Sequence, residues 1–321
     1  MTGFCVLGCG TMGKALLTGI FDSVAENGVP TDVPFAVPDK YFACVKFAKE
    51  VEDGQRLLGG RAEFVQHSGN VRAAEQSQYV LLACKPQVAS EVLGVAGMRE
   101  ALKGKLVLSI LAGKTIDQLQ SMVDESTRVV RIMPNTASRI RESMSVICAG
   151  PRATPTDVEF AEWVFSGIGR TMQLDERLID AATALCGSGP AFVATMIEAM
   201  TDGGIMMGIP FRQAQELAAQ TMVGTAKMVI SGQHPAMIRN DVSIPLAVPS
   251  VVCWRLKTAN SVVPLLAVSR RPRSGHLVWA SKRPGLFCPF GKIAQEACMF
   301  HRRWHQLPLG HHPFSLSLAC R

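Results

Sequence analysis

Apolar residues gather in short continuous runs along the first half of the chain, separated by stretches in which they recur three and four positions apart. The runs cover residues 4–7, 41–45, 79–84, 106–113 and 129–135. Such runs are typical of strands buried on both faces of a parallel sheet. The stretches around residues 87–102 and 115–123 have helical character. This alternation predicts a doubly wound parallel α/β sheet.

The pattern then changes to helices alone. They are predicted at residues 176–185, 191–207 and 210–228. The sequence Gly-Ser-Gly-Pro at 187–190 separates the first two, with Ser188 available as an N-cap and Pro190 near the first helical turn. Helices this apolar usually pack on other helices or on a second subunit. We therefore predict a sheet domain at residues 1–172 and an all-helical domain at residues 173–245.

Residues 8–13, Gly-Cys-Gly-Thr-Met-Gly, lie between the first predicted strand and a helix that begins at Lys14. A strand, this glycine spacing and a helix, in that order, are what a dinucleotide-binding turn requires. Gly8 permits the tight turn, Gly10 lets a pyrophosphate approach the backbone, and Gly13 lets the helix pack closely on the strand. Glycine turns also serve structural ends, but the position of this one favours a Rossmann-like cofactor domain.

The end of the second predicted strand distinguishes between the two nicotinamide cofactors, because an acidic residue there binds the ribose 2′-hydroxyl of NAD. This strand follows a Pro-rich loop at residues 27–38, which we interpret as an insertion. It ends in Lys46, with Lys49 close behind and no carboxylate before Glu50. Basic groups suit the 2′-phosphate of NADP, so Lys46 favours NADPH. The alternative is that these lysines form a solvated helix face.

Charge divides the chain near residue 245. The chain as a whole carries a formal charge of +7 and is 48% hydrophobic, enough for two domains and a sizeable core. Residues 246–321 contain 11 Lys or Arg and one acidic residue, Glu296, whereas the residues before them contain 22 basic and 25 acidic ones. A basic segment usually suggests a nucleic-acid or membrane partner. This one lacks periodicity and is broken by prolines, so we expect an aberrant, disordered basic tail that binds no nucleic acid.

No apolar run approaches the roughly 18 residues that a membrane span needs, so we expect no membrane partner. The ten cysteines are irregularly spaced and form no Cys-x-x-Cys pair. Free thiols are typical of a reducing compartment, so we expect a cytoplasmic protein without disulfides or a bound metal. The chain opens on Phe4, Cys5 and Val6 without a basic leader, which favours a buried strand over a signal peptide.

Eight short motifs carry a more specific signal. Four lie in the first domain: the glycine turn at 8–13, Cys-Lys-Pro-Gln at 84–87, Ser-Ile-Leu-Ala-Gly at 109–113 and Met-Pro-Asn-Thr at 133–136. Four lie in the second: Gly-Ser-Gly-Pro-Ala-Phe at 187–192, Asp-Gly-Gly at 202–204, Gly-Ile-Pro at 208–210 and His-Pro at 234–235. In this order and approximate spacing, the chain from residue 1 to about residue 245 resembles the pyrroline-5-carboxylate reductase family.

The resemblance implies an NAD(P)H-dependent oxidoreductase acting on a CH–NH group. The family reduces a cyclic imine, L-1-pyrroline-5-carboxylate, by hydride transfer to C5, which gives L-proline in the last step of proline biosynthesis. The cofactor is NADPH, with NADH as the alternative, and the protein must bind, orient and exclude water. A protonated imine is already electrophilic, so no metal, covalent nucleophile or acid–base dyad is required, and we assign no catalytic residue. The family is homo-oligomeric.

By position, the resemblance places on the pyrophosphate the turn residues Gly8, Cys9, Gly10, Thr11, Met12 and Gly13. Beside the ribose and nicotinamide it places Asn70, Ala83, Cys84, Lys85 and Pro86, with Leu111 and Ala112 lining the nicotinamide face. Asn135 and Ser188 border the substrate cleft, and Glu176 lies near the ring nitrogen of the substrate. Lys85 could instead cap its strand, and Glu176 could be an ordinary helix-start carboxylate.

After Ser243 the sequence departs from the family pattern, which continues with Ser-Pro-Gly-Gly-x-Thr-Ile and a helix leading to Leu-Glu-Asp-Gly. Residues 244–250 read Ile-Pro-Leu-Ala-Val-Pro-Ser, without the glycine pair or the threonine that contacts the imine. Codons allowed for residues 246–264, shifted by two nucleotides, can spell Gly-Gly, Thr-Ile and Glu-Asp-Gly in the family's order. We interpret the tail as the family's coding sequence in another frame, through a gene-model error, a mis-spliced exon or a frameshifted gene.

As written, the chain should keep its cofactor domain and lose part of the substrate site and most of the dimer core. We predict that it binds NADPH and reduces the imine poorly or not at all. Two alternatives stay open. A non-catalytic dinucleotide-binding protein would fit the altered tail. A β-hydroxyacid dehydrogenase is less well supported, because residues 190–198 lack the lysine that those enzymes carry there.

Overall fold

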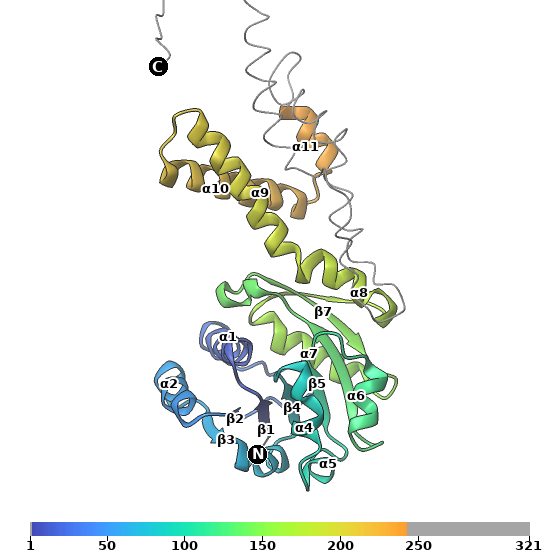
Figure 1. Cartoon of the computed structure of the whole chain (residues 1–321). Coiled ribbons are helices and arrows are strands. Elements are labelled where there is room, and N and C mark those ends of the chain that lie inside the picture. The colour runs from blue at the N-terminus through green and yellow to red at the C-terminus, as the bar shows by residue number, and fades with distance from the viewer. Residues whose placement is uncertain (1, 243–321) are drawn as a thin grey trace, which may run out of the picture. The chain divides into compact units, whose positions relative to one another are not determined.

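The computed structural model describes residues 2–242 of the 321-residue chain, so the predicted tail at residues 246–321 lies outside the described residues. Eight strands form one sheet (Figure 1). The strands are β1 (Gly3–Leu7), β2 (Lys40–Val45), β3 (Glu63–Gln66), β4 (Tyr79–Leu82), β5 (Leu106–Ser109), β6 (Arg128–Met133), β7 (Ser143–Ala149) and β8 (Gly169–Gln173). The helices around them are α1 (Thr11–Asn27), α2 (Ala48–Leu58), α3 (Asn70–Glu75), α4 (Ala89–Leu93), α5 (Met98–Ala101), α6 (Ile116–Met122) and α7 (Pro155–Ser166).

The strands lie in the order β3-β2-β1-β4-β5-β6-β7-β8. All neighbours are parallel except β6 and β7, where Val130 pairs with Ala149 in antiparallel register. The mostly parallel, doubly wound sheet predicted from the sequence is therefore confirmed. The chain builds outward from β1 to β3 and then returns to place β4 on the other side of β1. In open α/β sheets, ligands bind at the carboxyl ends of the strands where the order reverses in this way.

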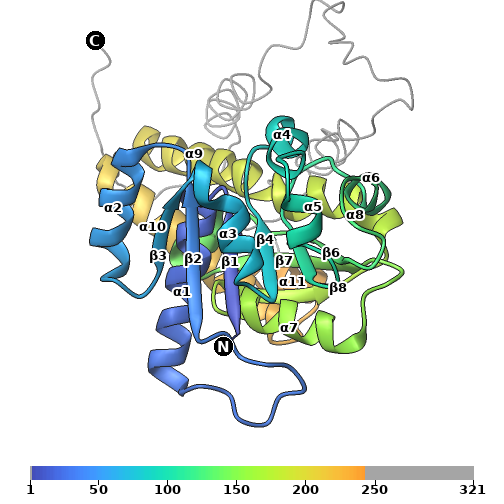
Figure 2. The same cartoon turned by 90° about the horizontal axis from the view of Figure 1, so that it is seen from below.

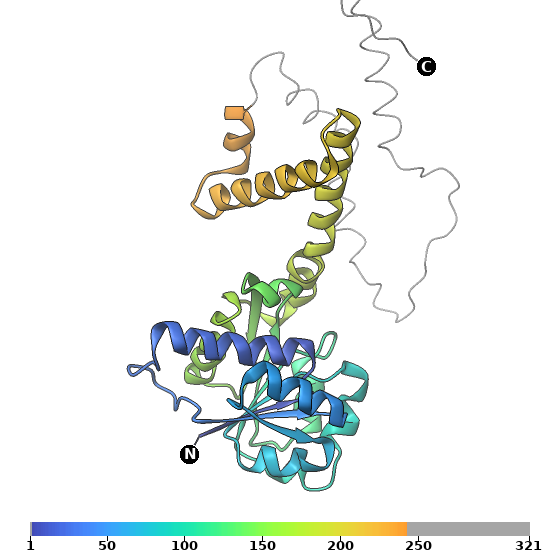
Figure 3. The ribbon, with the colours of Figure 1, turned by 90° about the vertical axis from the view of Figure 1, so that its left-hand side faces the viewer.

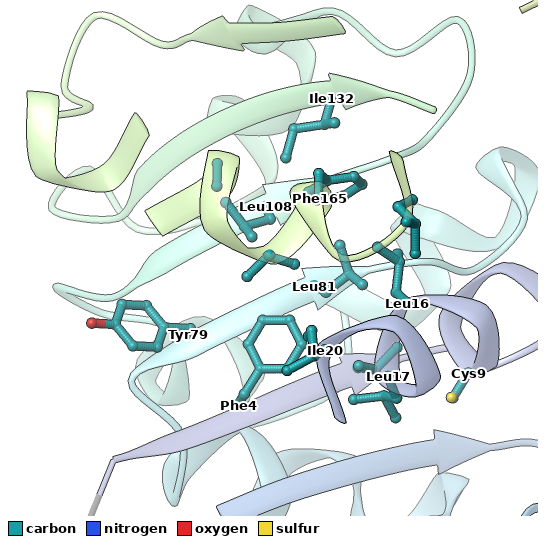
Figure 4. Close-up of a cluster of buried hydrophobic side chains, with 14 of the residues drawn as sticks. Phe4, Cys9, Leu16, Leu17, Ile20, Tyr79, Leu81, Leu108, Ile132 and Phe165 are labelled. Atoms are coloured by element: carbon teal, nitrogen blue, oxygen red, sulfur yellow. The ribbon is translucent and has the colours of Figure 1, made fainter. Parts of the chain in front are cut away.

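Both faces of the sheet are buried, as the continuous apolar runs predict. On one face α1 and α7 cover the strands, and Leu16, Phe160 and Phe165 are each fully buried there. Figure 4 shows Leu81 and Leu108 of the sheet lying against this layer. On the other face α3, α4, α5 and α6 pack against alternate residues of the same strands. The helices on the two sides are visible in Figures 2 and 3.

Some elements are absent from the sequence-based prediction. The strands β3 and β8 are the two edges of the sheet and lack the continuous apolar runs that identify the central strands. The strand β7 and the helix α7 are also absent from the prediction, although residues 146–149 of β7 form a short apolar run. The Pro-rich loop between α1 and β2 is anchored by Phe35. Its ring centroid lies 5.3 Å from that of Phe160 and 5.8 Å from that of Trp163.

The helical region begins with η4 (Glu176–Leu178) and α8 (Ile179–Ala182), and passes through a π-helical turn at Thr183–Gly187 into α9 (Gly189–Met206). The predicted interruption at residues 187–190 is confirmed, since the π turn ends at Gly187, Ser188 is the N-cap residue and α9 begins at Gly189. Pro190 lies in the first turn of α9, where its missing N–H is not needed, and the wider π turn accommodates the residues before it. The described chain ends with α10 (Phe211–Ile230) and α11 (Pro235–Val242).

The helices α9 and α10 leave much of their apolar surface exposed. Among their residues only Thr201, Ala214 and Ala218 are buried. The stretch Glu176–Met206 is also long and apolar enough to cross a membrane, with a hydropathy of 1.2 and 17% of the window buried. The expectation that no run reaches this measure is therefore wrong. The measure concerns length and composition alone, and it fits equally well a helix that packs against another subunit.

Candidate functional site

The glycine turn joins β1 to α1 at the point where the strand order reverses. Gly8 has φ +82°, and a Cβ there would lie 2.6 Å from Cys84 Cα, so the two strand ends meet without room for a side chain. The Gly8 and Cys9 N–H groups donate to Cys44 O at 3.1 and 2.7 Å, which fixes the turn against β2. A Cβ on Gly10 would have no heavy atom within 4 Å, so this part of the turn faces open space.

The N-terminus of α1 is available to an anion. Its N-cap residue is Gly10, no side chain caps the helix, and no acidic residue lies in its first turn. The first N–H groups of a helix have no partner within the helix and lie at the positive end of its dipole. The Thr11, Met12 and Gly13 N–H groups therefore form a phosphate-binding end next to the open space at Gly10.

The side chains of the turn have different surroundings. Cys9 is buried, and burial is the main reason why the pKa of its thiol is raised to about 12. Cys9 can therefore contribute only its backbone to a ligand. The Met12 sulfur accepts a hydrogen bond from Ser138 Oγ at 3.2 Å, which ties α1 to η3 (Thr136–Ile140). Of the turn residues assigned to the pyrophosphate, Gly10 and Thr11 are exposed.

The end of β2 presents the exposed Lys46, whose Nζ lies 5.7 Å from the centroid of the Phe47 ring. The Lys46 and Phe47 N–H groups both donate to Glu50 Oε2, at 3.2 and 3.0 Å. The carboxylate thus caps the backbone at the start of α2, whereas the Phe47 side chain offers no acceptor in return. Lys46 was predicted from the sequence as a cofactor residue, whereas Glu50 was not, because it lies beyond the strand. The signal that identifies it is an acidic residue at the third position of a helix, where it can accept the N-cap N–H.

At the end of β4, Ala83 N–H donates to Leu7 O at 2.9 Å, which extends the sheet pairing by one residue. Cys84 is partly buried, and burial raises the pKa of its thiol. Lys85 is exposed, and Pro86 begins the short helix η2 (Pro86–Val88). The four residues assigned to the ribose and nicotinamide thus lie along one strand end, next to the Gly8 turn.

Asn70 opens α3 and is only 4% exposed, and its Oδ1 atom has no hydrogen-bond partner among the described residues. A buried acceptor without a partner costs free energy, of about 1–3 kcal/mol, unless a ligand or water supplies a donor. Asn70 was assigned to the cofactor from its position alone, and this unpaired acceptor suits a sugar hydroxyl.

After β5, the two residues assigned to the nicotinamide face differ in environment. Leu111 is 2% exposed and belongs to the core layer of α3 to α6, and its N–H lies 3.4 Å from Ser109 Oγ. Ala112 is exposed. Leu111 therefore supports the end of β5 from within the core, while Ala112 is exposed and can contact a ligand.

Asn135, at the end of β6, connects the sheet to the helical region. Its Nδ2 donates to Cys186 O at 3.1 Å and its Oδ1 accepts from Ala137 N–H at 3.0 Å. Cys186 belongs to the π-helical turn immediately before Ser188, so Asn135 holds that turn in place. Ser188 is exposed, and its side chain makes no cap bond to α9, contrary to expectation. Its hydroxyl is therefore available to a ligand.

Glu176 is held by the protein itself. Its Oε1 accepts from Ile116 N–H at 2.7 Å and from Arg131 Nη1 at 2.9 Å. Arg131 is 6% exposed and was not among the predicted residues, since a single arginine within the apolar β6 run gives no sequence signal of a site. The ion pair compensates the buried guanidinium, because an unpaired charge there would be strongly destabilising.

A cleft of about 590 Å³ lies beside this ion pair, between α6, β7 and β8, with Asp117, Asp175 and Glu176 on its walls. Glu176 is the one residue of the predicted site that lines it. Within residues 2–242, no group of three or more His, Cys, Asp or Glu side chains is arranged to hold a metal ion.

These features fit a nicotinamide dinucleotide. The open space at Gly10, the uncapped start of α1 and the unpaired Oδ1 of Asn70 lie on elements that converge at the strand-order reversal. Lys46 adds a cation at the end of β2. A lone buried thiol or a metal cluster would point to other chemistry, whereas this arrangement binds and orients a phosphate-bearing cofactor.

Comparison with known proteins places the chain among reductases of cyclic imines. A family model described as pyrroline-5-carboxylate reductase dimerisation matches residues 176–248. A second, described as NADP oxidoreductase coenzyme F420-dependent, matches residues 3–113. The pyrroline-5-carboxylate reductase of Schizosaccharomyces pombe is 72% identical over 246 residues, which is 76% of this chain and 87% of the relative. That of Lophium arboricola is 44% identical over 260 residues, 75% and 81% of the two chains.

Solved structures show the same architecture. The pyrroline carboxylate reductase of Plasmodium falciparum, solved with NADP bound, superposes with a TM-score of 0.69 at 25% identity, over 84% of this chain and 95% of its own. A pyrroline-5-carboxylate reductase of Coxiella burnetii superposes with a TM-score of 0.72 at 22% identity, over 84% and 96%, which supports the fold.

Proposed function

This chain belongs to the pyrroline-5-carboxylate reductase family, and from that premise we propose that it transfers a hydride from NADPH to the imine carbon of L-1-pyrroline-5-carboxylate, forming L-proline. It is an NAD(P)H-dependent oxidoreductase of the CH–NH group, and NADH is the alternative donor. The observation that carries the proposal is the glycine turn, where Gly10 faces open space at the uncapped start of α1.

The nicotinamide supplies the hydride, and the protein's residues position it. We assign the diphosphate to the N–H groups at residues 11–13 and the 2′-phosphate to Lys46. Asn70 accepts a hydrogen bond from a ribose hydroxyl. The strand ends at residues 83–86 and 111–112 border the nicotinamide, with Lys85 as a cation at the rim. Because these strand ends are fixed by the sheet, the nicotinamide is oriented before the imine arrives.

We assign the substrate to the junction between β6 and α9. The Ser188 hydroxyl offers a donor to the substrate carboxylate, because it is exposed and makes no cap bond to α9. Asn135 holds the turn before Ser188 in place through its bond to Cys186 O. Glu176 has its Oε1 engaged by Ile116 and Arg131, so Oε2 is the atom left to face the ring nitrogen. The cyclic imine is electrophilic once protonated, so these groups bind and exclude water rather than attack.

We propose that residues 1–172 bind the cofactor and residues 173–245 form a truncated substrate and dimerisation domain. The family match and the exposed apolar surface of α9 and α10 support a homo-oligomer. We propose that its core is compromised by residues 246–321, which we interpret as a frame-shifted segment, and that catalysis is consequently impaired. The free thiols favour a cytoplasmic location, and we propose neither a nucleic-acid nor a membrane partner.

The altered sequence after residue 245 favours one rival, a non-catalytic dinucleotide-binding protein. An assay of NADPH oxidation with purified full-length chain distinguishes the two. The family function predicts oxidation that depends on added L-1-pyrroline-5-carboxylate, at a rate far below that of a reductase with the family's C-terminal sequence. Binding of NADPH without imine-dependent oxidation would leave the rival. Absence of NADPH binding would overturn the proposal, and turnover equal to that of the intact reductase would overturn the impairment.

A further inference from the structure

The Glu50 carboxylate lies where the family's two possible cofactors differ. It accepts the Lys46 and Phe47 N–H groups at 3.2 and 3.0 Å, directly after β2. The end of this strand lies next to the glycine turn, because Gly8 and Cys9 donate to Cys44 O. This is the place in the fold where a dinucleotide presents its adenosine ribose, with a 2′-hydroxyl in NADH and a 2′-phosphate in NADPH.

Glu50 is also close to the glycine turn electrostatically. Burial is the main cause of the raised pKa of the Cys9 thiol, and Glu50 raises it further while Lys14 lowers it. The charges of Glu50 on α2 and Lys14 on α1 therefore both act on the glycine turn. The exposed Lys46 and Lys49 flank Glu50 on α2 and at its start. The end of β2 and the start of α2 thus combine two lysines with one carboxylate, and the carboxylate occupies two backbone donors.

We propose that Glu50 limits the preference of this chain for NADPH over NADH. Building on the proposed function, the inference follows from what each cofactor needs at the ribose. A 2′-phosphate requires donors and positive charge, and Glu50 both engages two N–H groups and opposes Lys46 and Lys49. A 2′-hydroxyl requires an acceptor, which the same carboxylate provides. Lys46 and Glu50 therefore favour opposite cofactors.

The substitution Glu50→Gln isolates the charge. Glutamine keeps an oxygen that can accept the Lys46 and Phe47 N–H groups, so the start of α2 keeps its capping bond. We expect adenosine 2′,5′-bisphosphate to bind the full-length variant about fivefold more tightly than the wild type, the effect of removing one partly screened like charge. We expect the affinity for AMP, which lacks the 2′-phosphate, to change less than about twofold. Calorimetric titration of both fragments measures this without turnover.

Three further variants test the interpretation. Glu52→Gln removes an exposed carboxylate from the same helix and should change the affinities for both fragments equally little. Glu50→Asp keeps the charge on a shorter side chain and should leave the bisphosphate-to-AMP ratio near that of the wild type. Lys46→Ala should weaken bisphosphate binding about fivefold and reduce its salt dependence. Titrations with NADP⁺ and NAD⁺ should follow the same order.

The outcomes separate this inference from the proposed function. If the wild type binds NADPH and Glu50→Gln leaves the bisphosphate-to-AMP ratio unchanged, the role of Glu50 is wrong while the cofactor site stands. If Glu50→Gln does not fold, Glu50→Ala replaces it: a bisphosphate-to-AMP ratio about fivefold above that of the wild type supports the inference, and an unchanged ratio overturns it. If the wild type binds neither fragment nor NADPH, both proposals fall.

Discussion

Two regions of this chain differ in how they bury their apolar residues. We call them the nucleotide half, which is the sheet region at residues 2–173, and the helical half, at residues 174–242. In the sheet and its helices, β1, β4 and β5 are buried along their whole length and aromatic rings such as Phe160 are fully enclosed. The helices α9 and α10 pack on each other, yet Met206 of α9 is 72% exposed, Ile230 of α10 is 64% exposed and Met207, directly after α9, is 85% exposed. Both halves are rich in apolar residues, so composition alone does not distinguish them.

The difference shows what covers the apolar surface of each half. A doubly wound sheet buries apolar residues within one chain, because helices cover both of its faces. Two long helices bury apolar residues only where they contact each other, and the rest of their apolar surface is buried only by contact with another molecule. No ion pair among the described residues joins α9, α10 and α11. The nucleotide half should therefore be stable alone, and the helical half only in an oligomer.

Truncation of Phe160 should produce the largest loss of stability. Its ring stacks on Tyr79 at 3.7 Å between centroids and meets the Phe4 ring at 6.1 Å. Phe160→Ala should lower the free energy of unfolding by about 3–5 kcal/mol, measured by urea denaturation. The matched control Met207→Ala, at an exposed position, should change it by less than about 0.5 kcal/mol. Equal losses in the two variants would contradict the contrast between the halves.

Two glycines of the turn should respond differently to one added methyl group. Gly8→Ala places a Cβ against Cys84 at a positive φ, so it should cost about 2–3 kcal/mol of stability. Gly10→Ala meets no atom within 4 Å, and stability should stay within about 1 kcal/mol of the wild type. Its NADPH affinity should nevertheless fall at least about tenfold, because the methyl group occupies the space of the diphosphate. Unfolding curves and NADPH titrations test both, and unaltered NADPH binding by Gly10→Ala would exclude the proposed diphosphate position.

Amide hydrogen exchange should show the contrast along one chain. We expect amides of α9 and α10 to exchange at least about a hundredfold faster than those of β1, β4 and β5, because exposed helices open at low free-energy cost. Exchange followed by mass spectrometry of peptides measures this on the full chain. Equal protection in both halves would show that the helical surface is covered after all, and therefore that the dimer core is intact.

The sequence was informative where burial and backbone geometry impose a pattern. Continuous apolar runs identify β1, β4 and β5, and the glycine turn is recognisable because Gly8 adopts a φ that other residues disfavour. The eight motifs led to the family, which comparison confirms. The π turn at Thr183–Gly187 could not be predicted, since Asn135 holds it from a distant strand.

Contacts between distant side chains account for the rest. The roles of Arg131 and Glu176 depend on an ion pair between residues 45 positions apart in the sequence. No local sequence pattern around either residue predicts this ion pair. Glu50 is the intermediate case, because its position in the first turn of α2 is a local signal, while its significance depends on the neighbouring glycine turn. Apolar helices, finally, look alike in sequence whether they face a core, a membrane or another subunit, so the exposure of α9 was beyond the sequence.

The smallest expected effect lies within the nucleotide half. Arg141 donates to both Glu26 oxygens, at 2.6 and 3.0 Å, and these bonds lower the pKa of the Glu26 carboxyl below its usual 4.5. A carboxyl with a lower pKa in the folded state stabilises the fold above its unfolded pKa, and that contribution is lost as the pH falls through the folded value. The stability advantage of the wild type over Glu26→Gln should therefore be small and constant above about pH 5 and shrink below it.

Since Glu26 is exposed, salt should weaken the same advantage. Denaturation of both proteins between pH 3 and pH 7 measures it, with Glu52→Gln on α2 as a control for the loss of an exposed charge that has no ion-pair partner among the described residues. An advantage that grew on acidification would reverse the sign required by the lowered pKa. A wild-type advantage that shrinks on acidification would show that the nucleotide half links α1 to the residues before β7 through an ion pair of its own. Among the described residues, α9 and α10 form no ion pair.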